Sequence, residues 1–144
     1  MQIYNNTIYN NGGSALGLGS NCHGCESALT NAKVRNNILY GHPFDGVRLE
    51  GGTTGVTYSN NLCSSLQNGC TVTGDPMFTN PGGFDFTLQA GSPAIDAGIS
   101  LSTVPTDFSG ISRTQGTGYD IGAYEYQGFQ LPAPKTLRII SVVP

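Results

Sequence analysis

Charged residues are scarce in this sequence. Only 10% of the 144 residues are Asp, Glu, Lys or Arg, and six cations against nine carboxylates give a net charge of −3. A protein that binds nucleic acid or an anionic membrane surface needs a concentrated basic field. This sequence has none, so we expect no nucleic-acid partner. It also lacks a run of about 18 apolar residues, so it predicts no membrane span.

Uninterrupted helical segments and the common catalytic signatures are missing too. Twenty-one glycines and frequent Asn pairs punctuate the chain, so turns are frequent and strands must be short. There is no Gly-x-Ser-x-Gly elbow, Walker loop, HExxH helix or Rossmann fingerprint. The length fits one domain. Apolar residues occur only in short runs, so a single compact sandwich is not the expected fold.

A repeated unit occupies the first half of the chain: a short apolar strand, an Asn pair and a second apolar pair. It occurs at 3–9, 34–40 and 57–63. The second members of the Asn pairs are Asn6, Asn37 and Asn61, so the spacings are 31 (37 − 6) and 24 (61 − 37) residues. These spacings bracket one turn of a β-solenoid, and the longer one carries an insertion at 20–30.

A second register agrees with this period. Leu16-Gly-Leu18 and Val47-Arg-Leu49 are also 31 residues apart (47 − 16), and each alternates as a half-buried strand should. We expect equivalent strands of successive coils to pair in parallel, about 4.8 Å apart, with Ile, Val and Leu stacked inside. An Asn at the same corner of each coil would adopt the unusual backbone conformation there. Its amide would also hydrogen-bond to the amides above and below, which predicts an Asn ladder.

A different pattern begins after Cys70. Its motifs are Gly74-Asp-Pro-Met-Phe78, Phe84-Asp-Phe-Thr-Leu88, Gly91-Ser-Pro-Ala-Ile-Asp-Ala-Gly98, Thr106-Asp-Phe-Ser-Gly110 and Tyr119-Asp-Ile-Gly-Ala-Tyr-Glu-Tyr126. This segment closely resembles the C-terminal segment of bacterial right-handed parallel β-helix repeat proteins of the pectate-lyase-like or choice-of-anchor kind. The resemblance covers residues 1–126, and 75–126 is its specific part. It implies an all-β fold: a right-handed parallel β-helix fragment of about three coils with a C-terminal cap.

The resemblance, together with the composition of the tail, divides the chain into three parts. Residues 1–74 form the parallel β-helix coils, 75–126 the last partial coil and the C-terminal cap, and 127–144 a Pro-rich spacer and a terminal strand. A cap is physically required, because an uncovered final coil exposes a sheet edge and the end of an apolar interior. We expect 92–98 to lie over that open end. The side chains available to fill it are Phe78, Phe84, Phe86, Leu88, Ile95 and Phe108.

Four cysteines form two close pairs, Cys22 with Cys25 and Cys63 with Cys70. Each pair lies in a stretch rich in Gly, Asn and Ser, which suits local disulfides in a secreted or cell-surface protein. A zinc site with four thiolate ligands is the alternative. Cys22-His-Gly-Cys25 has the spacing of a zinc knuckle, but six residues instead of two separate Cys63 from Cys70.

Ionisable and aromatic residues of the coils are the candidates for function. The predicted catalytic residues are Lys33, Arg35, Arg48, His42 and Asp45. The predicted substrate-binding residues are Tyr40, Tyr58, Glu50 and His23. Alignment of the Asn pairs gives Tyr4, Arg35 and Ser59 one equivalent position, so their side chains should leave the same face and line a shallow groove. Such a groove fits an extended polymer better than a small metabolite.

Each of these candidates also has a structural interpretation. His42 precedes Pro43 and would be a turn residue, and His23 would be an ordinary loop residue between two cysteines. Four tyrosines recur beside the Asn pairs and would stack on their neighbours, although outward-facing rings would also form a platform for sugars. They are Tyr4, Tyr9, Tyr40 and Tyr58.

The resemblance to β-helix polysaccharide lyases implies a chemistry for the groove. A Lys or Arg abstracts the proton beside a uronic carboxylate, and Ca²⁺ or another Arg neutralises that carboxylate. Lys33, Arg35 or Arg48 would play these parts. A glycoside hydrolase would instead need two carboxylates about 5 to 9.5 Å apart. The coil candidates for that pair are Asp45 with Glu50 or Glu26.

Carboxylates concentrate in the cap segment. Six of the nine lie there: Asp75, Asp85, Asp96, Asp107, Asp120 and Glu125. We interpret them as scaffold, with Arg113 paired to Asp107 or Asp120 in a fork that pins the cap. Calcium is an alternative ligand for this cluster, because oxygen-rich loops suit it, but neither an EF-hand nor an RTX nonapeptide is present.

Two functions follow from these patterns. The first is an extracellular carbohydrate-active β-helix that binds or cleaves a polysaccharide along its flank, as a lyase or a hydrolase. The second is a non-catalytic structural or adhesin-like surface module. Catalysis requires the coil candidates to converge on one substrate position, whereas a structural module leaves them dispersed. The first coil, at 3–9, is open, so we also expect self-association through it.

Overall fold

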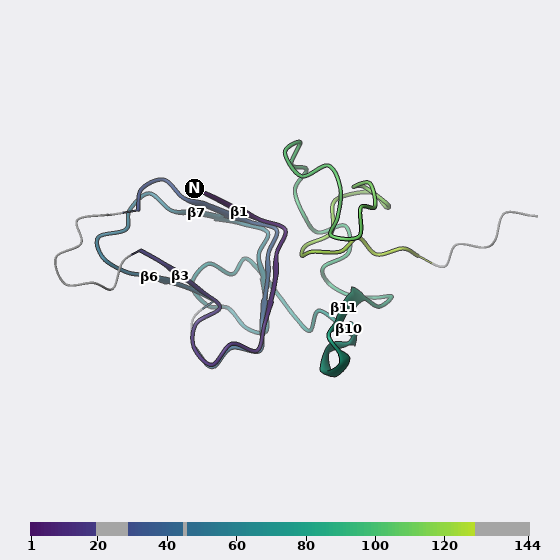
Figure 1. Cartoon of the computed structure of the whole chain (residues 1–144), viewed down its shortest axis with the longest axis horizontal. Coiled ribbons are helices and arrows are strands. Elements are labelled where there is room, and N and C mark those ends of the chain that lie inside the picture. The colour runs from purple at the N-terminus through teal and green to yellow at the C-terminus, as the bar shows by residue number, and fades with distance from the viewer. Residues whose placement is uncertain (20–28, 45, 129–144) are drawn as a thin grey trace, which may run out of the picture.

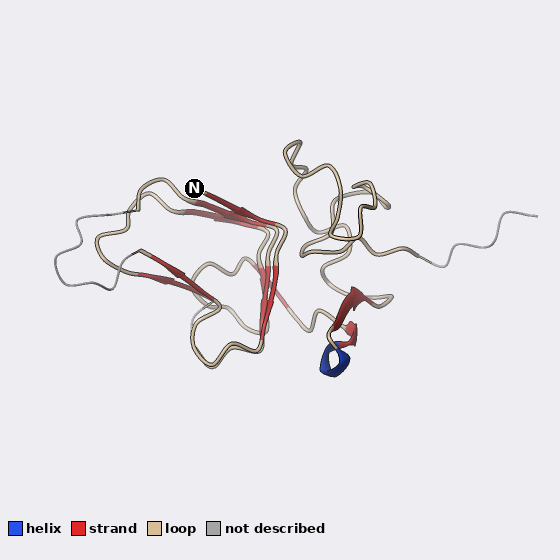
Figure 2. Ribbon diagram, in the orientation of Figure 1, coloured by secondary structure: helices blue, strands red, loops and turns tan. Residues whose placement is uncertain are grey.

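The computed structural model describes residues 1–19, 29–44 and 46–128. Their regular structure is β apart from one short 3₁₀ helix, η1 (Pro81–Gly83) (Figure 2). The strands are β1 (Gln2–Tyr4), β2 (Thr7–Tyr9), β3 (Leu16–Leu18), β4 (Lys33–Arg35), β5 (Ile38–Tyr40), β6 (Val47–Leu49), β7 (Thr57–Ser59), β8 (Leu62–Cys63), β9 (Val72–Thr73), β10 (Phe78–Asn80) and β11 (Asp85–Leu88). The all-β prediction is confirmed for these residues. Within them, no helix has the length and apolar character to cross a membrane.

Parallel pairing joins strands that belong to successive repeats. The first sheet contains β1, β4 and β7, the second β2, β5, β8 and β9, and the third β3 and β6. In Figure 1 the strands of each sheet lie almost on top of one another. Each repeat is therefore one pass of the chain: β1–β3 belong to the first pass, β4–β6 to the second, and β7 and β8 to the third.

The register of the sheets matches the repeats in the sequence. Ile3 pairs with Val34, which pairs with Tyr58. The third sheet aligns Leu16 with Val47. Both predicted registers, and the equivalence of Tyr4, Arg35 and Ser59, are confirmed.

Apolar side chains from all three sheets meet in one interior core. Val34 of β4, Leu39 of β5 and Val47 of β6 are each at most 1% exposed and belong to the same buried cluster. Side chains alternate between the two faces of a strand. Residues that alternate with these core positions therefore point away from the interior, and those on different sheets point in different directions.

The second Asn of each pair forms the predicted ladder. Asn6 Nδ2 donates to Asn37 Oδ1, and Asn37 Nδ2 donates to Asn61 Oδ1, both at 2.9 Å. The backbone N–H groups of Asn6 and Asn37 donate to the same two oxygens at 3.0 Å. Asn37 and Asn61 are fully buried, so the ladder supplies hydrogen bonds to backbone groups that water does not reach.

The first Asn of each pair makes the turn. Asn5, Asn36 and Asn60 have φ angles of 52°, 54° and 52°, in the left-handed region that Asn adopts at lower cost than most residues. The Asn36 side chain accepts from the Ile99 N–H at 3.0 Å and donates to the Ile99 carbonyl at 2.8 Å. The sequence interpretation gave the turn and the ladder to one Asn. The structure places the shorter ladder bonds on the second Asn, and among the turn residues Asn36 Nδ2 also donates to Asn5 Oδ1 at 3.4 Å.

The C-terminal segment packs on the outer face of the second sheet. β10 and β11 form an antiparallel hairpin, and its Phe78 and Leu88 share a second buried cluster with Ile38, Leu62 and Ile121. Ile38 and Leu62 occupy neighbouring strands in register and face away from the first core. The second sheet is therefore buried on both faces, and its outer face requires lateral cover.

This arrangement differs from the predicted end cap. Residues 92–98 lie beside the turn Asn residues, since Asn60 donates to the Ala97 carbonyl at 2.7 Å. Two side chains predicted to fill the end of the interior, Phe84 and Phe108, are instead 83% and 80% exposed. The sequence showed that apolar residues were available, but it did not show that Ile38 would face outward and need them.

Cys63 and Cys70 form the predicted disulfide. This confirms the disulfide alternative for that pair, because zinc would require free thiolates. Cys22 and Cys25 lie outside the described residues, as does most of the spacer and terminal strand predicted at 127–144.

Candidate functional site

Lys33 and Arg35 lie on the outward face of the first sheet. They flank the buried Val34 in β4, so both side chains point away from the interior. Lys33 is in register with Gln2 and Thr57, and Arg35 with Tyr4 and Ser59. Two rows of side chains thus cross this face, in agreement with the predicted common face.

Arg35 and its neighbours form the more enclosed row. The Arg35 guanidinium carbon lies 5.9 Å from the centre of the Tyr4 ring, a distance at which cation–π attraction operates. Arg35 Nε and Ser59 Oγ are buried and have no hydrogen-bond partner among the described protein groups. Both can donate a hydrogen bond, so this row retains unused donors.

Arg48 and Glu50 occupy a different sheet. Arg48 lies in β6, next to the buried Val47, and its Nε is 2.9 Å from Glu50 Oε1. The Arg48 side chain is 60% exposed, so this ion pair contributes little to stability. Each of these two predicted site residues is nevertheless already paired with the other.

His42 is held by the backbone of the first pass. Its Nδ1 accepts from the Asn11 N–H at 3.2 Å, and its Nε2 lies 3.2 Å from the Ile8 carbonyl oxygen. A backbone donor at one nitrogen and a backbone acceptor at the other fit a neutral ring protonated on Nε2. Partial burial lowers the pKa of His42 below its usual value. Backbone groups therefore lie within hydrogen-bond distance of both ring nitrogens, which agrees with the structural interpretation of His42.

The two predicted substrate-binding tyrosines face different environments. Tyr40 stacks on Tyr9, with ring centres 6.4 Å apart and planes 13° from parallel, and its edge meets Phe78. Burial, with help from nearby Asp75, raises the pKa of Tyr40. Tyr58 packs against the first interior core, and its buried hydroxyl has no described partner. Tyr58 therefore faces the wrong way to stack on a sugar in the predicted groove.

The described members of the predicted catalytic set lie on different parts of the passes. Lys33 and Arg35 leave the first sheet, Arg48 leaves the third, and His42 is bound to the first pass at the end of the second. Acid–base catalysis needs its groups within hydrogen-bond reach of one proton. Asp45, His23 and Glu26 lie outside the described residues.

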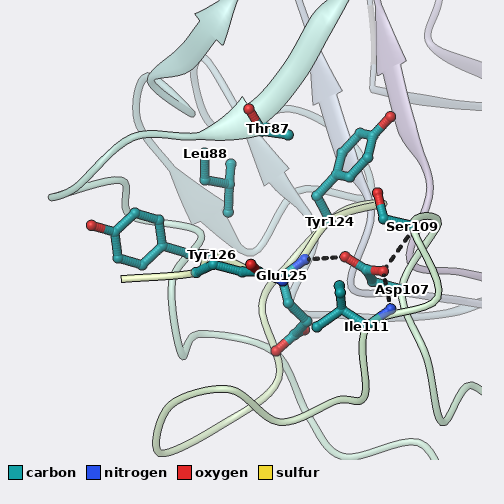
Figure 3. A pocket seen from close by; sticks show the side chains of 9 residues that line it. Thr87, Leu88, Asp107, Ser109, Ile111, Tyr124, Glu125 and Tyr126 are labelled. Atoms are coloured by element: carbon teal, nitrogen blue, oxygen red, sulfur yellow. Dashed lines mark hydrogen bonds between the residues drawn. The ribbon is translucent and has the colours of Figure 1, made fainter. Parts of the chain in front are cut away.

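A pocket that the sequence interpretation did not identify lies in the C-terminal segment (Figure 3). Its volume is about 430 Å³. It is lined by Thr87, Leu88, Asp107, Ser109, Ile111, Tyr124, Glu125, Tyr126 and Gln127. Two carboxylates beside tyrosines and hydroxyls would suggest a glycosidase pair. The hydrogen bonding of those carboxylates decides against it.

The Asp107 carboxylate is hydrogen-bonded to backbone N–H groups. Its Oδ1 accepts from the N–H groups of Ser109 and Ile111, both at 2.8 Å, and its Oδ2 accepts from the Glu125 N–H at 3.0 Å. Figure 3 shows these bonds drawn across the pocket wall. Three backbone N–H groups therefore occupy both oxygens of this carboxylate, so Asp107 holds the loops of the C-terminal segment together.

The Glu125 carboxylate forms an ion pair with Arg113. Their side chains are 0% and 1% exposed, and Arg113 Nη1 lies 2.5 Å from Glu125 Oε1. Arg113 Nη2 also donates to the carbonyls of Gly122 and Ala123. The prediction that an Arg–carboxylate pair pins this segment is confirmed, but its partner was wrong. Arg113 pairs with Glu125, whose two oxygens also accept from the backbone N–H groups of Asp120 and Gln115.

Asp120 is the most perturbed carboxyl group. Burial is the main cause that raises its pKa to about 6, and the charges of Glu125 and Asp96 add to the effect. Backbone N–H groups of Tyr126 and Asp96 donate to its two oxygens and oppose this shift. Asp120 is buried and does not line the pocket. Its raised pKa therefore results from burial within the C-terminal segment.

Among the described residues, no three His, Cys, Asp or Glu side chains are grouped so that they could hold a metal ion. Comparison with protein-family models, curated proteins and solved structures gave no match to this chain.

Proposed function

We propose that this chain is a segment of an extracellular right-handed parallel β-helix protein that binds an extended acidic polysaccharide without cleaving it. The proposed binding surface is the outer face of the first sheet. One observation carries the proposal: Lys33 and Arg35 project from the same face of β4, with Tyr4 in register beside Arg35. The Cys63–Cys70 disulfide supports the extracellular setting.

Three features support the β-helix. Strands of successive passes pair in parallel, the three sheets contribute to one interior, and the Asn ladder runs from pass to pass. Connections between parallel strands of one sheet are right-handed in about 98% of cases. Right-handed winding is therefore the expected sense for passes of this kind.

Charge and spacing on this face support an acidic polymer. Lys33 and Arg35 are two positions apart in one strand, a separation of about 7 Å. The described ion pairs are Arg48–Glu50 and Arg113–Glu125, so no described carboxylate neutralises either cation. The guanidinium of Arg35 can bind a carboxylate, and the Tyr4 ring offers an apolar surface to a sugar. The two rows continue across three strands at intervals of about 4.8 Å, which suits a chain molecule.

Binding without cleavage is supported by the state of the other polar groups. His42 is locked by two backbone bonds, Arg48 is paired with Glu50, and Arg48 and Lys33 lie on different sheets. In addition, Asp107 and Glu125 in the C-terminal pocket are already satisfied as acceptors.

Isothermal titration with polygalacturonate, alginate and a neutral glucan tests the proposal. We expect saturable binding of the acidic polymers, and an affinity loss of about tenfold or more in the Lys33→Ala/Arg35→Ala variant. Arg48→Ala is the matched control, since it removes a cation from another sheet. Reducing-end and unsaturated-product assays should stay at background with Ca²⁺ or with EDTA. Equal binding by the double variant, preference for the neutral glucan, or turnover of any polymer contradicts the proposal.

A non-catalytic structural or adhesin-like module is the second candidate. The observation in its favour is the use of polar side chains for internal support, above all the buried Arg113–Glu125 pair and the Asn ladder. The same titration separates the two candidates, because this one predicts that no polysaccharide binds.

A further inference from the structure

A hollow of about 410 Å³ lies between the ends of β2 and β5 and the β10–β11 hairpin. Its lining includes three aromatic side chains, one thioether, one carboxylate and one carboxamide. They belong to Tyr9, Tyr40, Phe78, Met77, Asp75 and Gln89. No described lysine, arginine or histidine lines it. The hollow therefore combines apolar and aromatic surface with one negative charge.

The two tyrosines form a column that ends at Tyr40. Tyr9 and Tyr40 are in register on neighbouring strands, and their rings stack with centres 6.4 Å apart. The register of β8 with β5 gives Ser64 the position in the third pass that Tyr40 has in the second. Ser64 is small and exposed. No ring continues the column, so no described aromatic residue stacks on the side of Tyr40 that faces the third pass.

The hairpin holds the opposite wall in place. The Phe78 ring stands nearly perpendicular to both tyrosine rings, at 81° to Tyr9 and 90° to Tyr40, and Phe78 is only 6% exposed. The Gln89 side chain donates to the Phe78 carbonyl at 2.8 Å, and the Gln89 N–H donates to the Met77 carbonyl at 2.9 Å. These contacts form the wall without a ligand, which lowers the entropic cost of binding.

Met77 has an unusual backbone conformation for its residue type. Its φ is 51°, in the left-handed region that side chains other than Asn and Asp rarely adopt. The Asp75 carboxylate accepts from the Met77 N–H at 2.9 Å and supports this turn. The Met77 side chain is still 37% exposed and lines the hollow. The turn therefore presents a thioether and a carboxylate to the same space.

The Asp75 carboxylate is an exposed charge without a described cationic partner. It belongs to neither of the described ion pairs. One of its oxygens accepts from the Met77 N–H, and no described group donates to the other. Burial is the main cause that raises the pKa of Tyr40, and the Asp75 charge adds to it. Asp75 and Tyr40 thus lie close enough for one ligand to contact both.

We propose that this hollow binds a quaternary ammonium group of the kind that choline carries. Such a group spreads its charge over methyl groups and needs no hydrogen bonds, so it suits apolar and aromatic walls. The Asp75 carboxylate and the electron-rich rings both attract its positive charge. A primary ammonium is more strongly hydrated and would exchange its water for one available carboxylate oxygen. The hollow lies on the second sheet, so the inference does not depend on glycan binding by the first.

Isothermal titration of the intact chain with choline and with 3,3-dimethylbutan-1-ol tests the inference. The second compound has the shape of choline with carbon in place of the charged nitrogen. We expect saturable binding of choline and binding of the neutral compound that is weaker by about tenfold or more. Asp75→Asn keeps an acceptor for the Met77 N–H but removes the charge, so it should weaken choline binding by about tenfold. Asp85→Asn is the matched control, because Asp85 belongs to the same hairpin but does not line the hollow. It should leave choline affinity unchanged.

NMR spectra of the wild-type complex locate the ligand. The choline methyl protons should show nuclear Overhauser contacts with Tyr40 and Met77. Thermal unfolding of the Asp75→Asn and Asp85→Asn variants should match that of the wild type, so that a change in affinity reports on the site. Phosphatidylcholine vesicles then distinguish two sources of the group. Sedimentation of the chain with the vesicles assigns a lipid headgroup, and choline binding without sedimentation assigns a soluble compound.

Four outcomes overturn the inference. The first is equal affinity for choline and the neutral compound, and the second is unchanged choline affinity in folded Asp75→Asn. The third is equal weakening by Asp85→Asn, which would mean that overall charge and not the hollow attracts choline. The fourth is contact of the choline methyl groups with residues outside the hollow.

Discussion

Asn37 connects the first pass to the third: its Oδ1 accepts from Asn6, and its Nδ2 donates to Asn61 Oδ1, each at 2.9 Å. The same Nδ2 lies 2.9 Å from the carbonyls of Ile3 and Arg35. One fully buried amide therefore satisfies backbone and side-chain groups on three successive passes. This side chain does not face solvent, so its importance is structural.

Replacement of Asn37 by Ala should destabilise the chain strongly. The change leaves several buried polar groups without partners, so we expect the free energy of unfolding in urea to fall by about 3 kcal/mol. Asn6→Ala is the matched control, because Asn6 is exposed at the end of the ladder and water can replace its bonds. Equal losses of unfolding free energy in the two variants would contradict this account. They would show that burial does not decide how much a ladder residue contributes to stability.

Asn10 tests the left-handed turn without the ladder. It has a φ of 53°, and Gly41 with a φ of 76° follows the equivalent strand of the second pass. Asn10→Gly should leave the free energy of unfolding nearly unchanged, whereas Asn10→Val should lower it by about 1 to 2 kcal/mol because a β-branched residue is strained there. A Val variant as stable as the Gly variant would mean that the turn does not require this conformation.

His42 should make stability depend on pH in the range where histidine titrates. Burial lowers the pKa of His42 in the folded state, so the unfolded chain takes up the proton first as the pH falls. The stabilisation is complete above the unfolded pKa of about 6.5 and is lost as the pH falls through the lower folded value. The midpoint of urea unfolding should therefore drop over this range in the wild type, and His42→Gln should remove that drop. A wild-type profile that coincides with that of the variant would contradict the placement of the ring.

Asp120 should contribute a slope of opposite sign. Its pKa is raised from 3.8 to about 6 in the folded state, so the folded chain holds a proton that the unfolded chain has lost. Its contribution is complete below pH 3.8 and is lost as the pH rises through about 6. Asp120→Asn should flatten this part of the profile. A carboxyl resonance of Asp120 that titrates near pH 4 in NMR spectra would contradict the burial argument.

Removal of either partner of the Arg113–Glu125 pair alone should destabilise the chain. Arg113→Met leaves the Glu125 carboxylate buried and uncompensated, so thermal unfolding should show a loss of about 3 to 5 kcal/mol. The Arg113→Met/Glu125→Gln double variant should recover part of that loss, because the uncompensated charge is gone. A double variant with the summed cost of both single variants would show that the two side chains act independently.

The sequence predicted the passes and the ladder because those features repeat. Asn6, Asn37 and Asn61 recur in a constant local pattern, so their equivalence needed no knowledge of packing. The C-terminal segment has no repeat, and its position depends on Ile38 and Leu62 facing outward. These residues belong to the same apolar runs as the interior residues Leu39 and Cys63, and a short apolar run does not reveal which of its residues face the interior.

Site prediction was limited for a related reason. Residue type identified Lys33 and Arg35 as cations on one face, but type alone did not reveal that backbone groups would occupy both nitrogens of His42. The C-terminal pocket joins residues from β11 and from loops near Asp107 and Glu125. No local spacing in the sequence connects these segments, so only the fold brings them together.

Nuclear Overhauser measurements on the chain in solution test the central claim, that successive passes stack in parallel along the Asn column. We predict cross-strand contacts that link Ile3 to Val34 and Val34 to Tyr58, together with contacts between the side-chain amides of Asn6, Asn37 and Asn61. Close Hα–Hα contacts between β1 and β4, as antiparallel strands give, or amides of Asn37 and Asn61 without mutual contacts, would contradict it.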